Sequence, residues 1–444
     1  MVTTTTSVTG VPSSGAAPFD ADAVYRKVSW RIMPLLLISY AVAYIDRINV
    51  GYAQLQMKET LSFDAAVYGL GAGIFFLGYV LFELPSNLLL ERIGARKTLL
   101  RIMFCWGIVA AAMMFVTTPT QFYILRFLLG VFEAGFFPGV ILYLTYWYPS
   151  TRRAQMISIF FCATTLAGVI AGPMSGGIMK YMNGLNGMAG WQWLFVVQGL
   201  PATVLGVLAY FYLQDKPEHA KWLSQGEKNL LRHNLEHDTP PVASASHGSV
   251  TQMLLRDPKV YLLSLAYFLL MGATYTMVFW IPTLIKSWGI QDLFMIGLYG
   301  AVPSLFGVVG MVLFGRSSDR LNERRWHFMA CACIAALGLG ITTVTQGQFG
   351  ASLAALSFAV IGIAAALPMF ITITTDYLPK AAAAAGIALI SSLGNLGSMV
   401  SPSITGLITA RTGSPTYSMY LVMALYLAAG TLLLLAIRAR RAGR

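Results

Sequence analysis

Two charged side chains interrupt a stretch of the chain that is otherwise apolar. They are Arg126 and Glu133, within ILRFLLGVFEAGFFPG at residues 124–139. An arginine keeps its proton in a protein and must be balanced wherever it lies. A charge at the centre of a bilayer costs between ~2.5 and ~17 kcal/mol depending on the method, and such residues usually face a cavity and mark a pathway. Seven residues make two helical turns, so the two side chains share one face of a helix, roughly 10 Å apart.

A second charged pair, Asp46-Arg47, lies in the first apolar stretch. Arg47 comes about six residues before the outer end of its helix, and Arg126 about six residues after the outer start of its own, so both lie roughly 9 Å deep. Guanidinium binds a carboxylate through a bidentate fork that lysine cannot copy. The pattern predicts that the two arginines converge on one anion. In the alternative, they only pair with Asp46 and Glu133 and lock this half together; the two interpretations are compatible, because four such charges leave an empty site neutral.

Aromatic and amide side chains on the same helices are candidates for substrate contacts. Tyr44 precedes Arg47 by three residues and therefore shares its face. Aromatic residues in membrane helices more often pack or anchor at the interface, so Tyr44, Tyr79 and Tyr275 have both interpretations. Asn395 belongs to a polar row that either joins helices or contributes to substrate binding. The second half has no basic residue inside a helix, so an anion must anchor on the first half.

Further acidic and basic residues are candidates for gating. Glu83 lies in the second apolar stretch, and we expect it to act in a gate or an interhelical hydrogen bond rather than as a substrate contact. A loop charge motif occurs twice, as Glu91, Arg92, Arg96 and Lys97, and as Asp319, Arg320 and Arg324. We expect these loop charges to latch the cytoplasmic side in one state; alternatively they only set topology, and both can hold.

The composition defines the class of protein. The chain is 57% hydrophobic and only 11% charged, against about 25% charged in soluble domains, and its mean hydropathy is +0.66. Apolar runs near 20 residues, each long enough to span a bilayer, predict an all-α membrane protein with twelve transmembrane helices. We place these helices at 30–52, 67–90, 98–117, 120–146, 155–181, 193–213, 258–285, 294–315, 327–345, 349–377, 383–410 and 416–438.

The distribution of basic residues sets the orientation. Of the 30 Lys and Arg residues, only Lys58, Lys180, Lys286 and Arg411 fall on one side, and Arg47 and Arg126 lie within helices. The remaining basic residues lie on the side of both termini, which the positive-inside rule makes cytoplasmic. The net charge of +12 is therefore a topology signal facing anionic lipid, which argues against nucleic-acid binding.

An internal repeat divides the chain into two halves. Glu91-Arg92 matches Asp319-Arg320 at an offset of 228, and Pro138 matches Pro368 at an offset of 230. Such spacing predicts two pseudo-symmetric six-helix halves in parallel orientation. Ser224 and Glu227 have the spacing of a capping box, so we expect a short surface helix to start there, before the second half. The expected domains are a disordered tail (1–24), an N-terminal bundle (25–213), a cytoplasmic central loop (214–257), a C-terminal bundle (258–438) and a basic tail (439–444).

Several segments resemble a known family. The loop ERIGARK at 91–97 and its echo SDRLNERR at 318–325 resemble the cytoplasmic motif of the major facilitator superfamily. Within that superfamily, YIDRINVGYA (44–53), FELPSNLLLERIGARK (82–97), RFLLGVFEAGFFPGVILYLTYWYP (126–149) and DKPEHAKWLS (215–224) look like the anion:cation symporter family, nearest its tartrate, phthalate and hydroxyphenylacetate permeases.

The resemblance implies a role for each matching residue. It places Asp46 and Glu133 at the proton-linked carboxylates, and Arg47 and Arg126 at the substrate-anion positions. Tyr44 and Tyr79 would line the cavity, and Asn395 would face it from the second half. The first loop motif has Glu91 where the superfamily usually has Asp, a change we expect to matter little.

We therefore expect a proton-coupled symporter that imports a small organic carboxylate across the inner membrane by alternating access, as a monomer and without cofactor or metal. The four cysteines all fall in apolar runs and are interpreted as small buried hydrophobic residues. No HExxH, GxSxG or phosphate-loop motif indicates an enzyme. The alternative is an anion exchanger or a proton-coupled exporter on the same fold, because GVIAGPMSGG at 168–177 resembles a drug-antiporter motif. A Gly/Pro hinge for close helix packing is our preferred explanation of that segment.

Overall fold

The computed structural model describes residues 20–238, 254, 256–379 and 383–437. Over these residues, 12 helices are long and apolar enough to cross a membrane, which confirms the predicted fold class. The helices are α1 Ala21–Ile48, α2 Val50–Thr60, α3 Ala65–Ile93, α4 Ala95–Ala112, α5 Pro119–Glu133, α6 Phe136–Thr145, α7 Ser150–Tyr181, α8 Gly190–Tyr212, α9 Gln225–His237, α11 Pro258–Ser287, α12 Leu293–Leu321, α13 Arg325–Val344, α14 Phe349–Tyr377, α15 Ala383–Asn395, α16 Gly397–Thr412 and α17 Thr416–Ala436.

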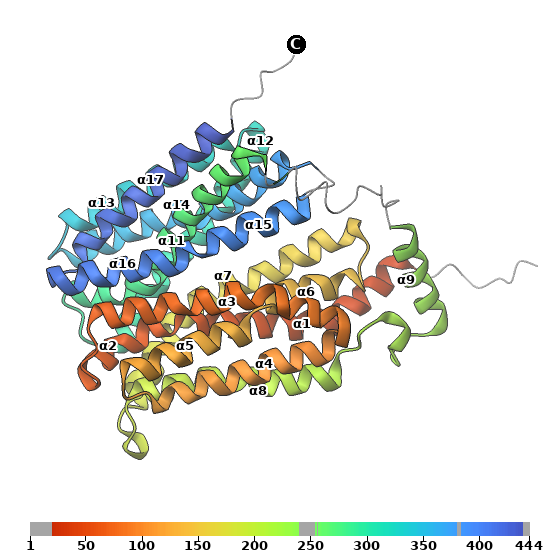
Figure 1. Cartoon of the computed structure of the whole chain (residues 1–444), viewed down its shortest axis with the longest axis horizontal. Coiled ribbons are helices and arrows are strands. Elements are labelled where there is room, and N and C mark those ends of the chain that lie inside the picture. Colours follow the sequence, from red (N-terminus) through yellow and green to blue (C-terminus); the bar gives the residue numbers. More distant parts are fainter. Residues whose placement is uncertain (1–19, 239–253, 255, 380–382, 438–444) are drawn as a thin grey trace, which may run out of the picture.

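The spanning helices form two bundles that lie side by side (Figure 1). Helices α1 to α8 make up the first bundle, drawn in red to yellow-green, and α11 to α17 the second, drawn in green to blue. The small helix α9 lies at one end of the first bundle, and we call that end the α9 face. The helix ends at Thr60, Tyr181, Ser287 and Thr412 lie at the opposite face.

The first helix begins earlier than hydropathy predicts. Helix α1 starts at Ala21, where the Asp20 side chain accepts a hydrogen bond from the backbone N–H of Asp22, so the expected tail of residues 1–24 is too long by four residues. The extra turns contact protein rather than hydrocarbon, since Tyr25 stacks on Tyr148 with ring centroids 6.0 Å apart. A hydropathy window detects only the part of a helix that lies in lipid.

Helix α9 ties the first bundle together at the α9 face. It begins at the capping box that Ser224 and Glu227 predict, and both oxygens of Glu227 accept bonds from Lys27 of α1, at 2.8 and 2.9 Å. At its other end, Asp238 accepts bonds from the backbone N–H and hydroxyl of Ser150, the first residue of α7. The hydroxyl bond holds the pKa of Asp238 below its ordinary range. The central segment is therefore partly a structured clamp on the first half; its residues 239–253 lie outside the described part, as does the basic tail.

The two bundles meet closely near the opposite face, where glycines allow helix backbones to touch. A Cβ on Gly172 of α7 would lie 2.2 Å from the carbonyl oxygen of Gly297 on α12. Polar contacts accompany this approach: Lys286 pairs with Glu59 at 2.7 Å. Two further cross-bundle contacts, Gln54 with Thr283 and Lys180 with Asp292, lie at the same face. This face is therefore closed in the structure.

Gly172→Ala should weaken closure of the opposite face, because the added methyl collides with backbone that cannot move aside. Overpacking of this kind costs about 1–3 kcal/mol, so the ratio of closed to open molecules should fall at least about fivefold. Disulfide formation between cysteines introduced at Gln54 and Thr283, in a chain without its native cysteines, measures that population. Gly177→Ala is the matched control, because its Cβ would lie 3.6 Å from the Phe294 ring. Equal cross-linking in both variants would contradict the assignment.

Candidate functional site

The strongest contact of the predicted site joins Arg47 of α1 to Glu133 of α5. Both Nε and Nη2 of Arg47 donate to Oε1 of Glu133, the first at 3.1 Å. Glu133 is fully buried, whereas 14% of the Arg47 side chain is exposed. Nη1 of Arg47 donates to the hydroxyl of Tyr275 on α11 at 3.1 Å. The guanidinium therefore connects a buried carboxylate in the first half with a hydroxyl from the second half.

Arg126 is held differently, and no carboxylate in the described part of the chain pairs with it. Its Nε donates to the carbonyl oxygen of Gly71 at 3.1 Å, and Nη2 lies 3.5 Å from that of Ala72, both on α3. The side chain is fully buried, and Nη1 has no hydrogen-bond partner among the described residues. Buried polar groups are nearly always bonded, so Arg126 has donor capacity for an anion.

A single aromatic ring lies beside both guanidinium groups. The centroid of Phe75, on α3, is 5.1 Å from Cζ of Arg126 and 5.6 Å from Cζ of Arg47. Both distances fit cation–π contacts. Both arginines therefore lie beside one aromatic ring; that they converge on one anion stays a prediction. Phe75 was not predicted, because a buried phenylalanine in an apolar helix carries no distinguishing signal.

Asp46 faces away from Arg47. Its carboxylate accepts hydrogen bonds from Nε1 of Trp106 on α4, at 2.8 Å, and from Nδ2 of Asn49, at 3.1 Å. Among the described residues, no cation lies within ion-pair distance of Asp46. The alternative in which both arginines pair with both acids is therefore wrong in detail, since only Arg47 and Glu133 pair. Trp106 was also missed, although a tryptophan N–H within an apolar run indicates a hidden acceptor.

The predicted aromatic residues gather around Arg47 to different extents. The ring of Tyr79 lies 5.5 Å from Cζ of Arg47, and Tyr275 packs edge-on against Phe76 at 4.5 Å. Tyr44 is half-buried and packs with Ile45 and Ile48 against α7. Tyr79 and Tyr275 thus contact the arginine directly, whereas Tyr44 flanks it.

Two predicted residues lie outside the Arg47 cluster. Asn395 is the last residue of α15 and is half-buried, and none of the described contacts joins it to Arg47 or Arg126. Glu83 is half-buried on α3, and its Oε2 has no hydrogen-bond partner among the described residues. Neither residue is therefore hydrogen-bonded to the site in this structure, although the charges of Glu83 and Arg47 interact.

The fourth spanning helix is broken beside the site. The sequence predicts one continuous helix at 120–146, so the prediction is wrong at this break. Helix α5 ends at Glu133, and α6 starts at Phe136. Gly135 between them has φ +85°, and a Cβ there would lie 2.3 Å from the Ser86 hydroxyl oxygen. Only glycine fits both conditions.

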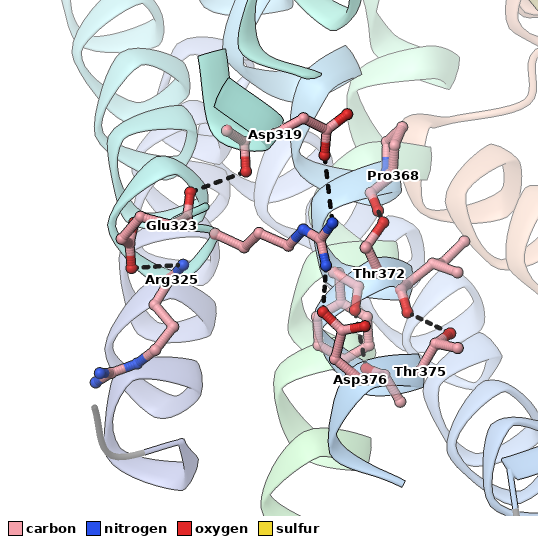
Figure 2. A network of polar contacts seen from close by, with 12 residues as sticks. Asp319, Glu323, Arg325, Pro368, Thr372, Thr375 and Asp376 are labelled. Atoms are coloured by element: carbon pink, nitrogen blue, oxygen red, sulfur yellow. Dashed lines mark hydrogen bonds and ion pairs between the residues drawn. The ribbon is translucent and has the colours of Figure 1, made fainter. Parts of the chain in front are cut away.

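The loop motifs are anchored within their own halves. Arg324 bonds to Asp319 at 3.3 Å and also pairs with Asp376 on α14 (Figure 2). Arg96 donates to the carbonyl oxygen of Tyr210 at 2.9 Å, and its backbone N–H to Asp215. Four motif side chains, Glu91, Arg92, Lys97 and Arg320, are exposed. No hydrogen bond or ion pair in the described part of the chain links these motifs across the halves, so the expected latch is not engaged here.

The fold and the site define a polytopic membrane protein with a buried, charged centre between two helical bundles, the organisation of a secondary transporter. The chain belongs to the Major Facilitator Superfamily, whose profile matches residues 36–402. It is 46% identical over 402 residues to a "Putative tartrate transporter" of Agrobacterium vitis, covering 90% of this chain and 92% of that protein. It is 43% identical to the "Putative metabolite transport protein NicT" of Pseudomonas putida, covering 88% and 89%. Since its relatives are transporters, the chain is a transporter and not an enzyme.

One further relative and two solved structures are also similar to this chain. A "Quinolone resistance transporter" of Acinetobacter baumannii is 40% identical over 90% of this chain and 92% of its own. The structure of a bacterial homolog of the human lysosomal transporter Spinster superposes with TM-score 0.74 at 17% identity, covering 95% of this chain and 97% of that one. A D-xylose-proton symporter superposes with TM-score 0.70 at 13% identity, covering 91% and 97%. These two structures share the fold.

Trp106→Phe should destabilise the first half, because it removes a donor from the buried Asp46 carboxylate. Leaving a charged acceptor short of a bond costs about 1–3 kcal/mol, so the free energy of unfolding in detergent should fall by that amount. Trp191→Phe is the matched control, since the Trp191 N–H bonds to Thr60, an exposed residue, where water replaces the lost donor. Equal losses in the two variants would contradict the special role of the Trp106 bond.

Proposed function

We propose that the protein is a proton-coupled symporter that imports a small organic carboxylate. The observation that supports this best is the Arg47–Glu133 pair, together with Arg126, which lies beside the same Phe75 ring and has an Nη1 without a partner among the described residues. One oxygen of an internal carboxylate accepts from Nε and Nη2 of Arg47, the edge of the guanidinium that a substrate carboxylate would use. Substrate and Glu133 therefore compete for one arginine.

This competition provides the coupling step. When Glu133 takes up a proton, it loses its charge, and Arg47 becomes available to the substrate carboxylate. Arg126 binds the same anion through its free donor, and Asp46 is the second carboxylate that carries a proton. When the proton leaves Glu133, the carboxylate reclaims Arg47 and expels the substrate. Empty and loaded sites then both remain near neutrality, which limits the cost of burying the charges.

The orientation follows from the basic residues. They concentrate on the α9 face, which we therefore place in the cytoplasm of a cell whose inner membrane holds the protein with both termini inside. The closed opposite face is then the outer one, and the structure corresponds to an inward-facing state. Glu83 and the two loop motifs would engage on the α9 face in the outward-facing state.

The substrate class is a small dicarboxylate, hydroxy acid or aromatic acid. The two arginines suit one or two carboxylates. The rings of Phe75, Tyr79 and Tyr275 add apolar surface, and two tyrosine hydroxyls add hydrogen-bonding groups. Tyr44 and Asn395 would join this lining when the halves rearrange. The names of the tartrate and NicT relatives agree with an organic anion.

An exporter is the second candidate function, since one relative is named as a quinolone resistance transporter. A cationic drug would be repelled by Arg47 and Arg126, but a drug with a carboxylate would not. Direction of transport therefore distinguishes the candidates better than charge does. In proteoliposomes with an inward proton gradient, the symporter accumulates tartrate, phthalate, 4-hydroxyphenylacetate or a hexonate, whereas an exporter of the antiporter type expels its substrate.

Glu133→Gln should abolish accumulation of the transported acid under a pH gradient and spare its exchange between two substrate-loaded sides. The variant cannot exchange a proton at this position, yet its amide resembles the protonated acid in shape. With one proton carried per substrate, a gradient of one pH unit is worth about 1.4 kcal/mol and supports roughly tenfold accumulation, which the variant should lose. Glu236→Gln, on the exposed face of α9, is the control and should behave as wild type. Retained accumulation in Glu133→Gln would remove Glu133 from the coupling mechanism.

A further inference from the structure

The first half contains a second buried polar feature, a row of side chains along α1 and α2 that starts at Asp46. Asn49, Ala53, Gln56 and Thr60 follow at spacings of three, four, three and four residues, so the row lies on one helical face. Asn49 has helical dihedral angles (φ −60°, ψ −28°), which carry the row from α1 into α2. At 1.5 Å per residue, it extends about 21 Å, from the centre of the bundle to the opposite face.

Helix α8 faces this row in matching register. Nε1 of Trp191 donates to the hydroxyl of Thr60 at 3.0 Å. Gln198 lies seven residues further along α8 and thus on the same face, about 10 Å deeper. Counting back the same number of residues from Thr60 gives Ala53. Gln198 therefore lies at the level of the smallest member of the row, between Asn49 and Gln56.

Helix α7 completes the enclosure. Gln56 donates to the carbonyl oxygen of Met179 at 3.3 Å, and Gln198 donates to the hydroxyl of Ser175 at 3.0 Å. Ser175 is one turn before Met179 and therefore lies deeper in the bundle, just as Gln198 lies deeper than Trp191 on α8. Helices α7 and α8 therefore flank the row, and the amides lie at successive levels along it.

Each of the three amides makes a hydrogen bond at one end only. Asn49, Gln56 and Gln198 donate through nitrogen, and their oxygens are buried without a partner among the described residues. Asn49 is 0% and Gln198 2% exposed. An unsatisfied buried polar group costs about 1–3 kcal/mol, and in proteins such groups are satisfied by ordered water when other groups do not reach them. Three unsatisfied amides in one row are therefore suited to hold a file of water molecules.

The row reaches Asp46 from the side away from the substrate. The charged groups that interact with the Asp46 carboxylate are Glu133 and Arg126 from α5, and α4 contributes the N–H of Trp106. Asn49, the first amide of the row, donates to Oδ1 of Asp46. Arg47 points towards α5 and α11 instead.

We propose that this row is a proton path, lined by water, that connects Asp46 with the outer face inside the first half, apart from the substrate route between the halves. The proposal rests on the proposed proton-coupled symport. A proton that enters near Thr60 passes from water to water and protonates the Asp46 carboxylate. The amides orient the water molecules and neither gain nor lose protons. The outer face can thus deliver protons to Asp46 while the two halves are closed over it.

The double variant Gln56→Met, Gln198→Met tests the path, since methionine is close to glutamine in shape but cannot hold water in place. The assay uses proteoliposomes and whichever of tartrate, phthalate, 4-hydroxyphenylacetate and the hexonate the wild type transports. The initial rate of uptake driven by a pH gradient should fall at least about tenfold, which is less than the effect that a positioned proton-transfer group typically has. Exchange at symmetrical pH should stay within about twofold of wild type. Pyranine fluorescence follows proton entry, and more acidic outer solution should partly restore the rate, an effect that a purely structural defect would not produce.

Thr405→Val is the matched control, because Thr405 is fully buried, has an unpartnered hydroxyl oxygen among the described residues and lies on α16. It should leave both rates unchanged. Wild-type rates in the double variant, with normal exchange, would overturn the proton path and leave the symport intact. Absence of pH-driven uptake in the wild type would overturn the proposed function itself, and the path with it.

Discussion

The structure of the site depends on the need to balance the charge of Glu133 inside the bundle. Removing one partner from a buried ion pair typically costs about 3–5 kcal/mol, and Glu133 is fully buried. Arg47 meets this need across the gap between α1 and α5, with two donors on one oxygen. The pair therefore joins the helices that carry the four charged residues. A site that neutralises itself when empty can be opened by any ligand that replaces the internal carboxylate.

The helix break after Glu133 belongs to the same constraint. A continuous helix from α5 into α6 would bond every backbone group internally, as the membrane demands. The turn at Gly135 interrupts this backbone hydrogen bonding locally, and the Ser86 hydroxyl lies against the turn. The break places Glu133 at the end of a helix, where its direction is not tied to the residues that follow. The proposed mechanism requires Glu133 to exchange partners, and a buried carboxylate is better placed for this at a helix end than in the middle of a rigid helix.

The sequence allowed the spans and the four charged residues to be predicted because each depends on local composition. Twenty apolar residues form a membrane helix almost regardless of their neighbours, and a charge among them is conspicuous. The pairing was not predictable in this way. Consecutive residues on a helix point about 100° apart, so Arg47 faces Glu133 while Asp46 turns to Trp106. Which helix lies on which side is a tertiary property, and the same is true of the early start of α1, which depends on contacts with α9.

In the proposed mechanism, the uneven distribution of charge between the halves lets anion binding in one half act on both. The second half offers Arg47 a single neutral hydroxyl, that of Tyr275. This bond crosses between the halves, close to where glycine contacts and ion pairs close the opposite face. An anion that draws Arg47 away from Glu133 must also change the geometry of the Tyr275 bond, because both use the same planar guanidinium. Anion binding in the first half is thereby coupled to a contact that depends on the present arrangement of the two halves. A rigid arginine side chain transmits this coupling more directly than a flexible lysine would.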